Sequence, residues 1–344
     1  MRSGVEATYR EDGPLIRYPT ILGVVLLGRG DEIIANTARG LADADRRIKM
    51  TPSTRFPLGA IADLFAVTAI LQLHEKGKLD LDAPIGTIIA DFPHGDKITP
   101  HHLVTHTSGL PHIGDYYFDD EGKKRRATDI ALDLLEGRGL SYDPGTRFNT
   151  TGGDSPTATD YLMVRYVIEK VSGRPYEDHL DEHIFQPAGM TNTVIATAGT
   201  AVENRALGYT VEGQTGGRTP TQVDEESVPR PSDDGLIVWS TGEDLYRWYS
   251  ALINGDLIGP ELAERMFTPV LKLPGDSGHA GYGWKIRETA FGYSTLHVAN
   301  LSGYNIEVRT FPDEDIFVIV FTNIEDFYPP RGQISWRLAT LALR

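Results

Sequence analysis

Apolar segments near both ends of the chain have the pattern of β-strands. Residues 20–28 (TILGVVLLG) and 32–36 lie on either side of a turn that contains Gly30, which predicts a hairpin. Residues 305–311 and 316–322 (IFVIVFT) predict a second pair of strands near the C-terminus. We therefore expect strands from the two ends of the chain to share one sheet.

The middle of the chain has the spacing of amphipathic and buried helices. Residues 60–76 repeat apolar positions at helical intervals, and Gly77 is a favourable residue just beyond the helix. Residues 161–172 and 242–254 have the same periodicity. A closing helix is predicted over residues 333–343.

These elements predict an α+β fold in which an antiparallel sheet from both chain ends is flanked by helices and carries an inserted helical lobe. Two polar segments, 115–126 and 213–230, are predicted as loops. We expect one structural unit over the whole chain, with an α/β lobe at approximately 1–58 and 280–344. The helical lobe is expected at approximately 59–279.

The excess of acidic over basic residues limits the kinds of partner that the chain is expected to bind. The chain has 344 residues, of which 33 are Lys or Arg and 48 are Asp or Glu, so the formal net charge is −15. A surface this acidic repels phosphate backbones and anionic lipid. We therefore expect a small-molecule substrate or ligand, and neither nucleic acid nor a membrane as partner. Nothing in the pattern fixes an oligomeric state.

Several kinds of site and segment are missing from the sequence. The chain has no cysteine, which excludes disulfides, thiol nucleophiles and cysteine metal sites. No glycine-rich phosphate loop follows a strand and no metal-ligand cluster has suitable spacing, so we expect no cofactor and no metal. The first 19 residues lack an apolar signal core, which predicts a cytoplasmic location.

An ordered series of motifs along the chain resembles the serine β-lactamase and penicillin-binding-protein superfamily. The resemblance implies the fold of class C β-lactamases, D-Ala-D-Ala carboxypeptidases and related esterases. The matching segments are residues 54–82 (TRFPLGAIADLFAVTAILQLHEKGKLDLD), 98–111 (ITPHHLVTHTSGLP), 144–148 (PGTRF), 161–173, 184–191 (IFQPAGMT), 235–236, 240–245, 282–284 (YGW), His297 and 322–323.

In that superfamily a serine and a lysine, in the motif S-x-x-K, perform covalent acyl transfer. The resemblance places Ala60 at the position of the serine and Asp63 at that of the lysine. Alanine has no nucleophile, so no acyl-enzyme can form at position 60. A carboxylate at position 63 reverses the local charge and favours a neutral or cationic ligand.

The two other catalytic motifs of the superfamily are also altered. The Y-x-N motif would fall on residues 150–152 when counted from Phe148, or on residues 156–158 when counted from Tyr161. Neither alignment supplies a tyrosine. Residues 297–299 (HVA) keep the histidine of the H-x-G motif and replace its glycine by Ala299.

Three functions are compatible with these residues. The first is a repurposed enzyme that uses non-covalent acid/base chemistry, with Asp63 and His297 as the catalytic pair. The second is a pseudoenzyme that binds a ligand or partner, in which Asp63 only stabilises a helix N-terminus. The third is an esterase- or amidase-type hydrolase whose nucleophile is another hydroxyl, with candidates Thr150, Thr151, Ser108, Ser155 and Ser302.

We favour the first function, with isomerisation, cyclisation, elimination or water-mediated hydrolysis as the reaction classes. His102 and His106, four residues apart on a predicted helix, are expected to have a structural role. Trp239 is expected to narrow the pocket or fill the core. The residues expected to contact the substrate are Ala60, Tyr116, Thr150, Asp154, Trp239, Ala299 and Tyr304.

Overall fold

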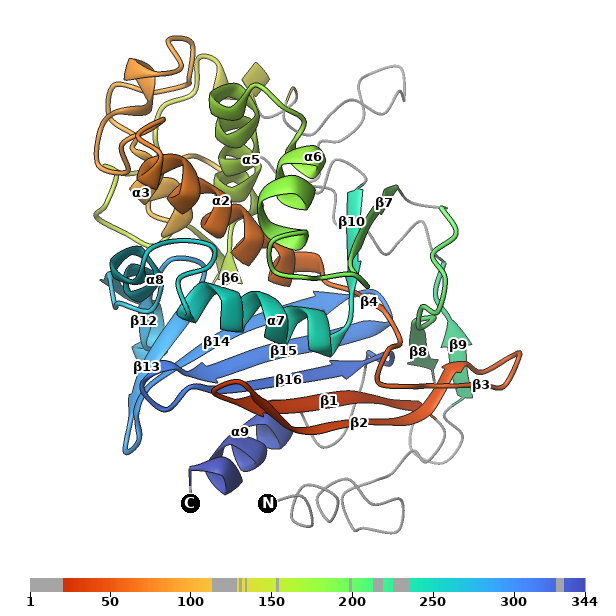
Figure 1. Cartoon of the computed structure of the whole chain (residues 1–344). Helices are drawn as coiled ribbons and strands as arrows, with labels where there is room; N and C mark the ends of the chain where they lie inside the picture. The colour runs from red at the N-terminus through yellow and green to blue at the C-terminus, as the bar shows by residue number, and fades with distance from the viewer. Residues whose placement is uncertain are drawn as a thin grey trace.

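The computed structural model describes residues 21–112, 129, 132–133, 135–152, 155–197, 200–212, 219–224, 236–325 and 331–343. Within these residues the main sheet has nine strands in the order β11-β12-β13-β14-β15-β16-β1-β2-β3 (Figure 1). Its strands are β1 (Ile21–Arg29), β2 (Glu32–Asp43), β3 (Ile48–Lys49), β11 (Leu271–Lys272), β12 (His279–Ala280), β13 (Lys285–Thr289), β14 (Gly292–Leu301), β15 (Tyr304–Phe311) and β16 (Ile316–Thr322).

The two ends of the chain meet in the middle of this sheet. β1 pairs with β16 in an antiparallel register that sets Val24 opposite Phe321 and Leu27 opposite Val318. The predicted hairpin and the predicted C-terminal strand pair are both confirmed as β1–β2 and β15–β16. The α+β architecture with a sheet built from both termini is therefore correct.

The sheet is buried on both faces because side chains alternate along each strand. In β16, Phe317, Ile319 and Phe321 join the large core on the side of the helical lobe. Val318 and Val320 point the other way and pack under α9 (Arg331–Ala342). Figure 1 shows α9 on one face and α7 (Gly242–Ile253) on the other.

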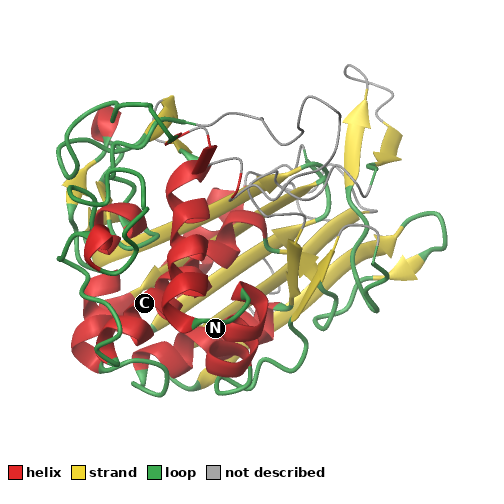
Figure 2. Cartoon of the chain, turned by 90° about the horizontal axis from the view of Figure 1, so that it is seen from above, coloured by secondary structure: helices red, strands yellow, loops and turns green. Residues whose placement is uncertain are grey.

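The helical lobe lies on the α7 side of the sheet, and in the view from above its helices overlie the strands (Figure 2). Its central helix, α2 (Asp63–Glu75), is buried on every side from Asp63 to Leu73, and only its last two residues reach solvent. The remaining helices of the described chain are η1 (Gly59–Ala62), η2 (Ile85–Thr87), α3 (Pro100–Val104), α5 (Ala158–Ser172), α6 (Tyr176–Leu180), the π-helix η3 (Asp181–Phe185), α8 (Pro260–Met266), η6 (Pro274–Asp276) and η7 (Pro312–Glu314).

Smaller strand groups connect the lobes. β10 (Leu236–Ser240) lies between β4 (Phe56–Pro57) and β7 (Val194–Thr197). β5 (Thr150–Gly152) pairs with β6 (Ser155–Pro156), and β8 (Tyr209–Glu212) pairs with β9 (Thr219–Gln222).

Two predictions of local structure need correction. The expected loop over 213–230 is wrong at β9, because its threonine-rich segment completes a ladder with β8. His102 and His106 do not share a helix: α3 ends at Val104, and His106 follows in the left-handed region with a φ of 54°. The predicted loop over 115–126 lies outside the described residues.

A close approach of backbone to sheet positions the start of the helical lobe. Gly59 has a φ of 51°, and a Cβ atom there would lie 2.8 Å from the Leu301 side chain of β14. Only glycine combines this conformation with this contact at little cost. η1, and with it Ala60, is therefore held against the end of β14.

A buried histidine in the helical lobe makes stability depend on pH. Burial, followed by the charges of His183, Lys76, Lys78 and Arg174, lowers the pKa of His179 to about 4. Neither of its ring nitrogens has a hydrogen-bond partner within the described part of the chain. Between the ordinary value of 6.5 and about 4, the unfolded chain binds a proton that the folded chain does not.

The free energy of unfolding is therefore expected to fall as the pH drops through that window. We expect His179→Gln to reduce the fall in melting temperature between neutral pH and pH 4.5 by a few °C. Calorimetry at several pH values would measure the melting temperature of both proteins. His279→Gln on β12 serves as the control. An unchanged pH profile in His179→Gln would contradict the assignment.

Candidate functional site

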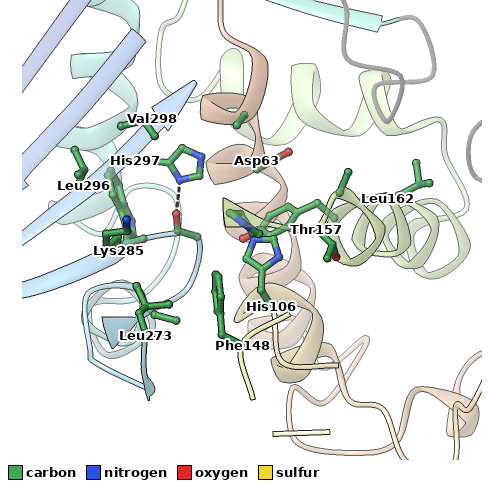
Figure 3. Close-up of a pocket in the computed structure, with 18 of the residues that line it drawn as sticks. Asp63, His106, Phe148, Thr157, Leu162, Leu273, Lys285, Leu296, His297 and Val298 are labelled. Atoms are coloured by element: carbon green, nitrogen blue, oxygen red, sulfur yellow. Dashed lines mark hydrogen bonds between the residues drawn. The ribbon is translucent and has the colours of Figure 1, made fainter. Parts of the chain in front are cut away.

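A cavity of about 420 Å³ lies between η1, α2 and α5 on one side and β13 and β14 on the other. This volume is typical of small-molecule sites. Figure 3 shows Asp63, His106 and His297 entering it from different elements. Its lining residues are Ala60, Asp63, His106, His112, Phe148, Pro156, Thr157, Ala158, Tyr161, Leu162, Arg165, Leu273, Ala280, Gly281, Gly283, Trp284, Lys285, Leu296, His297, Val298 and Asn300.

The start of α2 provides one wall of the cavity. Ala60 in η1 and Asp63, the first residue of α2, are three residues apart and both line the cavity. Asp63 is only 7% exposed, so its carboxylate lies in a largely dehydrated environment. Position 60 offers a methyl group, and the polar group of this wall is the carboxylate one turn further along the helix.

His297 of β14 provides the polar group of the opposite wall. Its Nδ1 is hydrogen-bonded to the carbonyl oxygen of Gly283. A carbonyl only accepts, so Nδ1 carries the proton and Nε2 carries the lone pair of the neutral ring. The ring of Trp284 lies nearly perpendicular to the imidazole, with the ring centroids 6.2 Å apart. His297 is thus held in one tautomer with Nε2 suited to accept a proton.

A second histidine reaches the cavity from the helical lobe. His106 Nδ1 lies 3.5 Å from Oδ2 of Asp160, a carboxylate with 0% exposure. Asp160 accepts hydrogen bonds from the Ser108 hydroxyl and, at 3.1 Å, from the Asn149 amide, whereas its contact with His106 is electrostatic and involves no hydrogen bond. The buried carboxylate therefore holds His106, Ser108 and Asn149 together behind the cavity wall.

Tyr161 lies between the two acidic groups and stays protonated. Its hydroxyl donates to the Val104 carbonyl at 3.1 Å. Burial, followed by the nearby charges of Asp63 and Asp160, raises the pKa of Tyr161 well above its ordinary value. A tyrosinate base at this position is therefore excluded at neutral pH.

The segment before α5 contributes to the cavity wall. Pro156, Thr157 and Ala158 line the cavity, and β5 lies beside Pro156 through its pairing with β6. Neither of the two alignments of the Y-x-N motif, on residues 150–152 or on residues 156–158, supplies a tyrosine.

The sequence as a whole matches the model of the Beta-lactamase family over residues 16–343. The chain is a member of the Beta-lactamase family. It is 32% identical over 305 residues to PbpX of Bacillus subtilis (strain 168), which carries a penicillin-binding-protein name; the match covers 88% of this chain and 71% of PbpX. It is 27% identical over 318 residues to penicillin-binding protein 4* of the same strain, covering 88% and 68%.

Solved structures show the same fold at lower identity. A penicillin-binding protein from Bacillus halodurans superposes with a TM-score of 0.76 at 24% identity, covering 94% of this chain and 96% of that one. D-amino acid amidase from Ochrobactrum anthropi SV3, complexed with L-phenylalanine, has a TM-score of 0.77 at 21% identity and covers 99% and 98%.

Only part of the predicted site of this Beta-lactamase-family chain comes together. Ala60, Asp63 and His297 line the same cavity. Tyr116 and Asp154 lie outside the described residues. The four remaining predicted contact residues are not among those lining the cavity, and these are Thr150, Trp239, Ala299 and Tyr304.

These four residues have other surroundings. Thr150 pairs with Pro156 in the β5–β6 ladder. Trp239 is buried in β10, where its ring lies 5.6 Å from the guanidinium of Arg205. The Tyr304 hydroxyl donates to the Ala206 carbonyl at 3.0 Å. Ala299 is a buried residue of β14, and its neighbours Val298 and Asn300 do line the cavity.

Two of the hydroxyl groups proposed as alternative nucleophiles lie outside the cavity lining. Ser108 is fully buried and bonded to Asp160, and neither Ser108 nor Ser302 lines the cavity. Among the lining residues just given, hydroxyls are present only on Thr157 and Tyr161. Thr157 is 1% exposed, and its hydroxyl has no hydrogen-bond partner in the described structure.

Several polar residues of the cavity were missed from the sequence. Arg165, Lys285 and Trp284 line it, and Asp160 supports it from behind. Arg165 was detectable, because it lies four residues after Tyr161 and so shares its helix face. Trp284 ends the motif at 282–284 and Lys285 follows it, but their approach to α5 depends on the fold.

The described residues contain no group of three or more His, Asp or Glu side chains arranged to hold a metal ion. Within the same ranges, no helix has the length and apolar character needed to cross a membrane.

Proposed function

We propose that this chain is an enzyme that acts on a small organic substrate by non-covalent acid/base catalysis. The observation that carries the proposal is the pairing of Asp63 and His297 across one cavity whose wall at position 60 is an alanine. Two titratable groups in different environments are what such chemistry requires. One accepts a proton from the substrate or from a water, and the other returns a proton at a second atom.

The proposal gives the two groups complementary roles. His297 has its proton on Nδ1, so Nε2 takes up a proton and the ring becomes an imidazolium that the Gly283 carbonyl continues to hold. Asp63 serves as the partner on the α2 wall. Isomerisation, cyclisation, elimination and hydrolysis by an activated water all fit this exchange of two protons.

A hydrolase with a relocated nucleophile is the second candidate. It is favoured by one observation, the unpartnered hydroxyl of Thr157 in the cavity wall. It also accords with the fold shared with an amidase. In that case a covalent intermediate would form on Thr157 and not at position 60.

A labelling experiment separates these functions. The chain is incubated with a β-lactam, an activated ester, a fluorophosphonate and D-amino acid amides, and both intact mass and released product are measured. We expect product from at least one substrate and no adduct on the protein, while an S-x-x-K relative treated in parallel is labelled.

Each departure from that result has a distinct meaning. A stable adduct mapped to Thr157 would replace acid/base catalysis by the hydrolase function. Ligand binding without product from any substrate would leave a binding protein.

A further inference from the structure

His106 brings a second imidazole to the cavity from the helical lobe, whereas His297 reaches it from the sheet. His106 follows α3 by two residues and lines the cavity beside the rings of Phe148 and Tyr161, whose centroids lie 5.7 and 4.6 Å from its own. Figure 3 shows the two histidines on different sides of the cavity. Catalysis by Asp63 and His297 leaves the imidazole of His106 without a role.

The backbone holds His106 in a conformation that few side chains adopt. Its φ is 54°, in the left-handed region, although the residue is not glycine. The backbone N–H of Asn149 donates to the His106 carbonyl at 2.6 Å, and the N–H of His106 donates to the Leu103 carbonyl at 3.1 Å. Backbone strain of this kind persists only where surrounding contacts enforce it, and it concentrates at functional sites.

One ring nitrogen of His106 faces a buried carboxylate. Nδ1 lies 3.5 Å from Oδ2 of Asp160 and makes no hydrogen bond to a described residue. Because a carboxylate accepts hydrogen bonds and does not donate them, the neutral ring is expected to carry its proton on Nδ1. Hydrogen bonds between catalytic groups often shorten only when the substrate is bound. The separation of 3.5 Å is therefore suited to a bond that closes as charge develops on the ring.

The other ring nitrogen of His106 is available to a ligand. Nε2 makes no hydrogen bond within the part of the chain that the structure describes, and it is not among the buried polar atoms that lack a partner. It lies on the opposite side of the ring from Nδ1 and so away from Asp160. With the proton on Nδ1, Nε2 has the lone pair that accepts a proton from the cavity.

The carboxylate behind His106 is itself fixed. Asp160 accepts hydrogen bonds from the Ser108 hydroxyl and, at 3.1 Å, from the side-chain amide of Asn149. The same amide donates to the Leu110 carbonyl at 2.9 Å. Asp160 is fully buried, so water screens its attraction for a positive ring only weakly. An imidazolium at His106 would therefore form beside a charge that is already in place.

We propose that His106 and Asp160 form a further acid/base dyad of the cavity. Nε2 of His106 takes a proton from the bound ligand or from a water beside it, and Asp160 stabilises the imidazolium until the proton is returned. The dyad rests on the proposed function, because it takes this cavity as the site of acid/base chemistry. With His297 on the sheet side, a proton can be removed on one side of the ligand and returned on the other. His106 thus has more than the structural role expected from its motif.

The position of the ring proton tests the dyad without a substrate. Long-range ¹H–¹⁵N spectra of the full chain, labelled with ¹⁵N-histidine, show which nitrogen of each neutral imidazole is protonated. His106→Asn identifies the His106 signals by their loss, and asparagine tolerates the left-handed backbone. We expect the proton of neutral His106 on Nδ1. A proton on Nε2 would overturn the dyad, because that nitrogen could then donate but not accept.

Turnover tests the catalytic role, with p-nitrophenyl acetate and D-phenylalanine amide as the activated ester and the amide. His106→Asn and Asp160→Asn are each expected to lower kcat by at least about 100-fold, and to change KM much less. The double variant is expected to lose no more than either single variant, because the two residues act as one unit. His279→Gln removes an imidazole from β12, outside the lining, and is expected to keep full activity.

Thermal unfolding of each variant separates catalysis from packing. A lower melting temperature of His106→Asn with unchanged kcat would assign His106 to packing against its neighbours and overturn the dyad. Turnover that is lost in Asp63→Asn but kept in both His106→Asn and Asp160→Asn would also overturn the dyad, and it would leave the proposed function intact. No product from any compound of the labelling experiment would overturn both.

Discussion

Asp63→Asn is expected to abolish turnover while leaving the melting temperature nearly unchanged. Asparagine matches the shape of aspartate but neither gains nor loses a proton in the accessible pH range. General acid/base groups contribute about 10²–10⁴-fold to rate, so we expect a loss of at least about 100-fold in kcat. The measurement is steady-state kinetics on the substrate identified by product release, together with thermal unfolding of both proteins.

The stability readout separates catalysis from a helix-terminus role. Asp63 is the acidic residue in the first turn of α2, where a negative charge gains about 0.3–1 kcal/mol from the helix dipole. Glu261→Gln removes the corresponding exposed acid from the first turn of α8 and serves as the matched control. Full activity in Asp63→Asn would show that the catalytic assignment is wrong.

Asp160→Ala is expected to lower the free energy of unfolding by about 3–5 kcal/mol. Removal of an acceptor that several buried donors share leaves each donor unsatisfied, which costs about 1–3 kcal/mol per group. Here the Ser108 hydroxyl, the Asn149 amide and the His106 ring all lose the carboxylate that they share. Chemical denaturation of the purified protein measures the effect.

The control for this variant is Asp143→Ala, which removes an exposed carboxylate from the loop before α5 and is expected to change stability by less than about 0.5 kcal/mol. Asp160→Asn keeps the shape and some of the hydrogen bonds, so it is expected to lose less than the alanine variant. Equal stability of wild type and Asp160→Ala would mean that the surrounding groups find other partners.

Much of the scaffold could be predicted from the sequence. The segments that form β1, β15 and β16 are rich in apolar and β-branched residues. The sheet is buried on both faces, which explains why the sequence of β16 is a nearly unbroken apolar run. The spacing of residues 60 and 63 along a helix already places both on one wall. Their partner His297 could be recognised because a motif of the superfamily marks it.

The rest of the site depends on tertiary contacts that the sequence does not encode locally. Pro156 and Thr157 reach the cavity wall only through the fold, and no local pattern in the sequence marks them. Trp239 and Tyr304 were expected at the ligand, but packing and a backbone acceptor hold them elsewhere. Arg165 and Lys285 are far apart in sequence, and only the closure of the helical lobe over β13 places them on one cavity.

The burial of α2 from Asp63 to Leu73 has a consequence for how this cavity can adapt. A helix packed around its whole circumference cannot slide or rotate without opening the core on several sides at once. The carboxylate of Asp63 is thus a fixed reference point, and ligands of different size must be accommodated by the segments opposite it. Substitutions that change specificity are therefore to be sought along residues 273–300. Substitutions along α2 would change specificity only at the cost of a less stable fold.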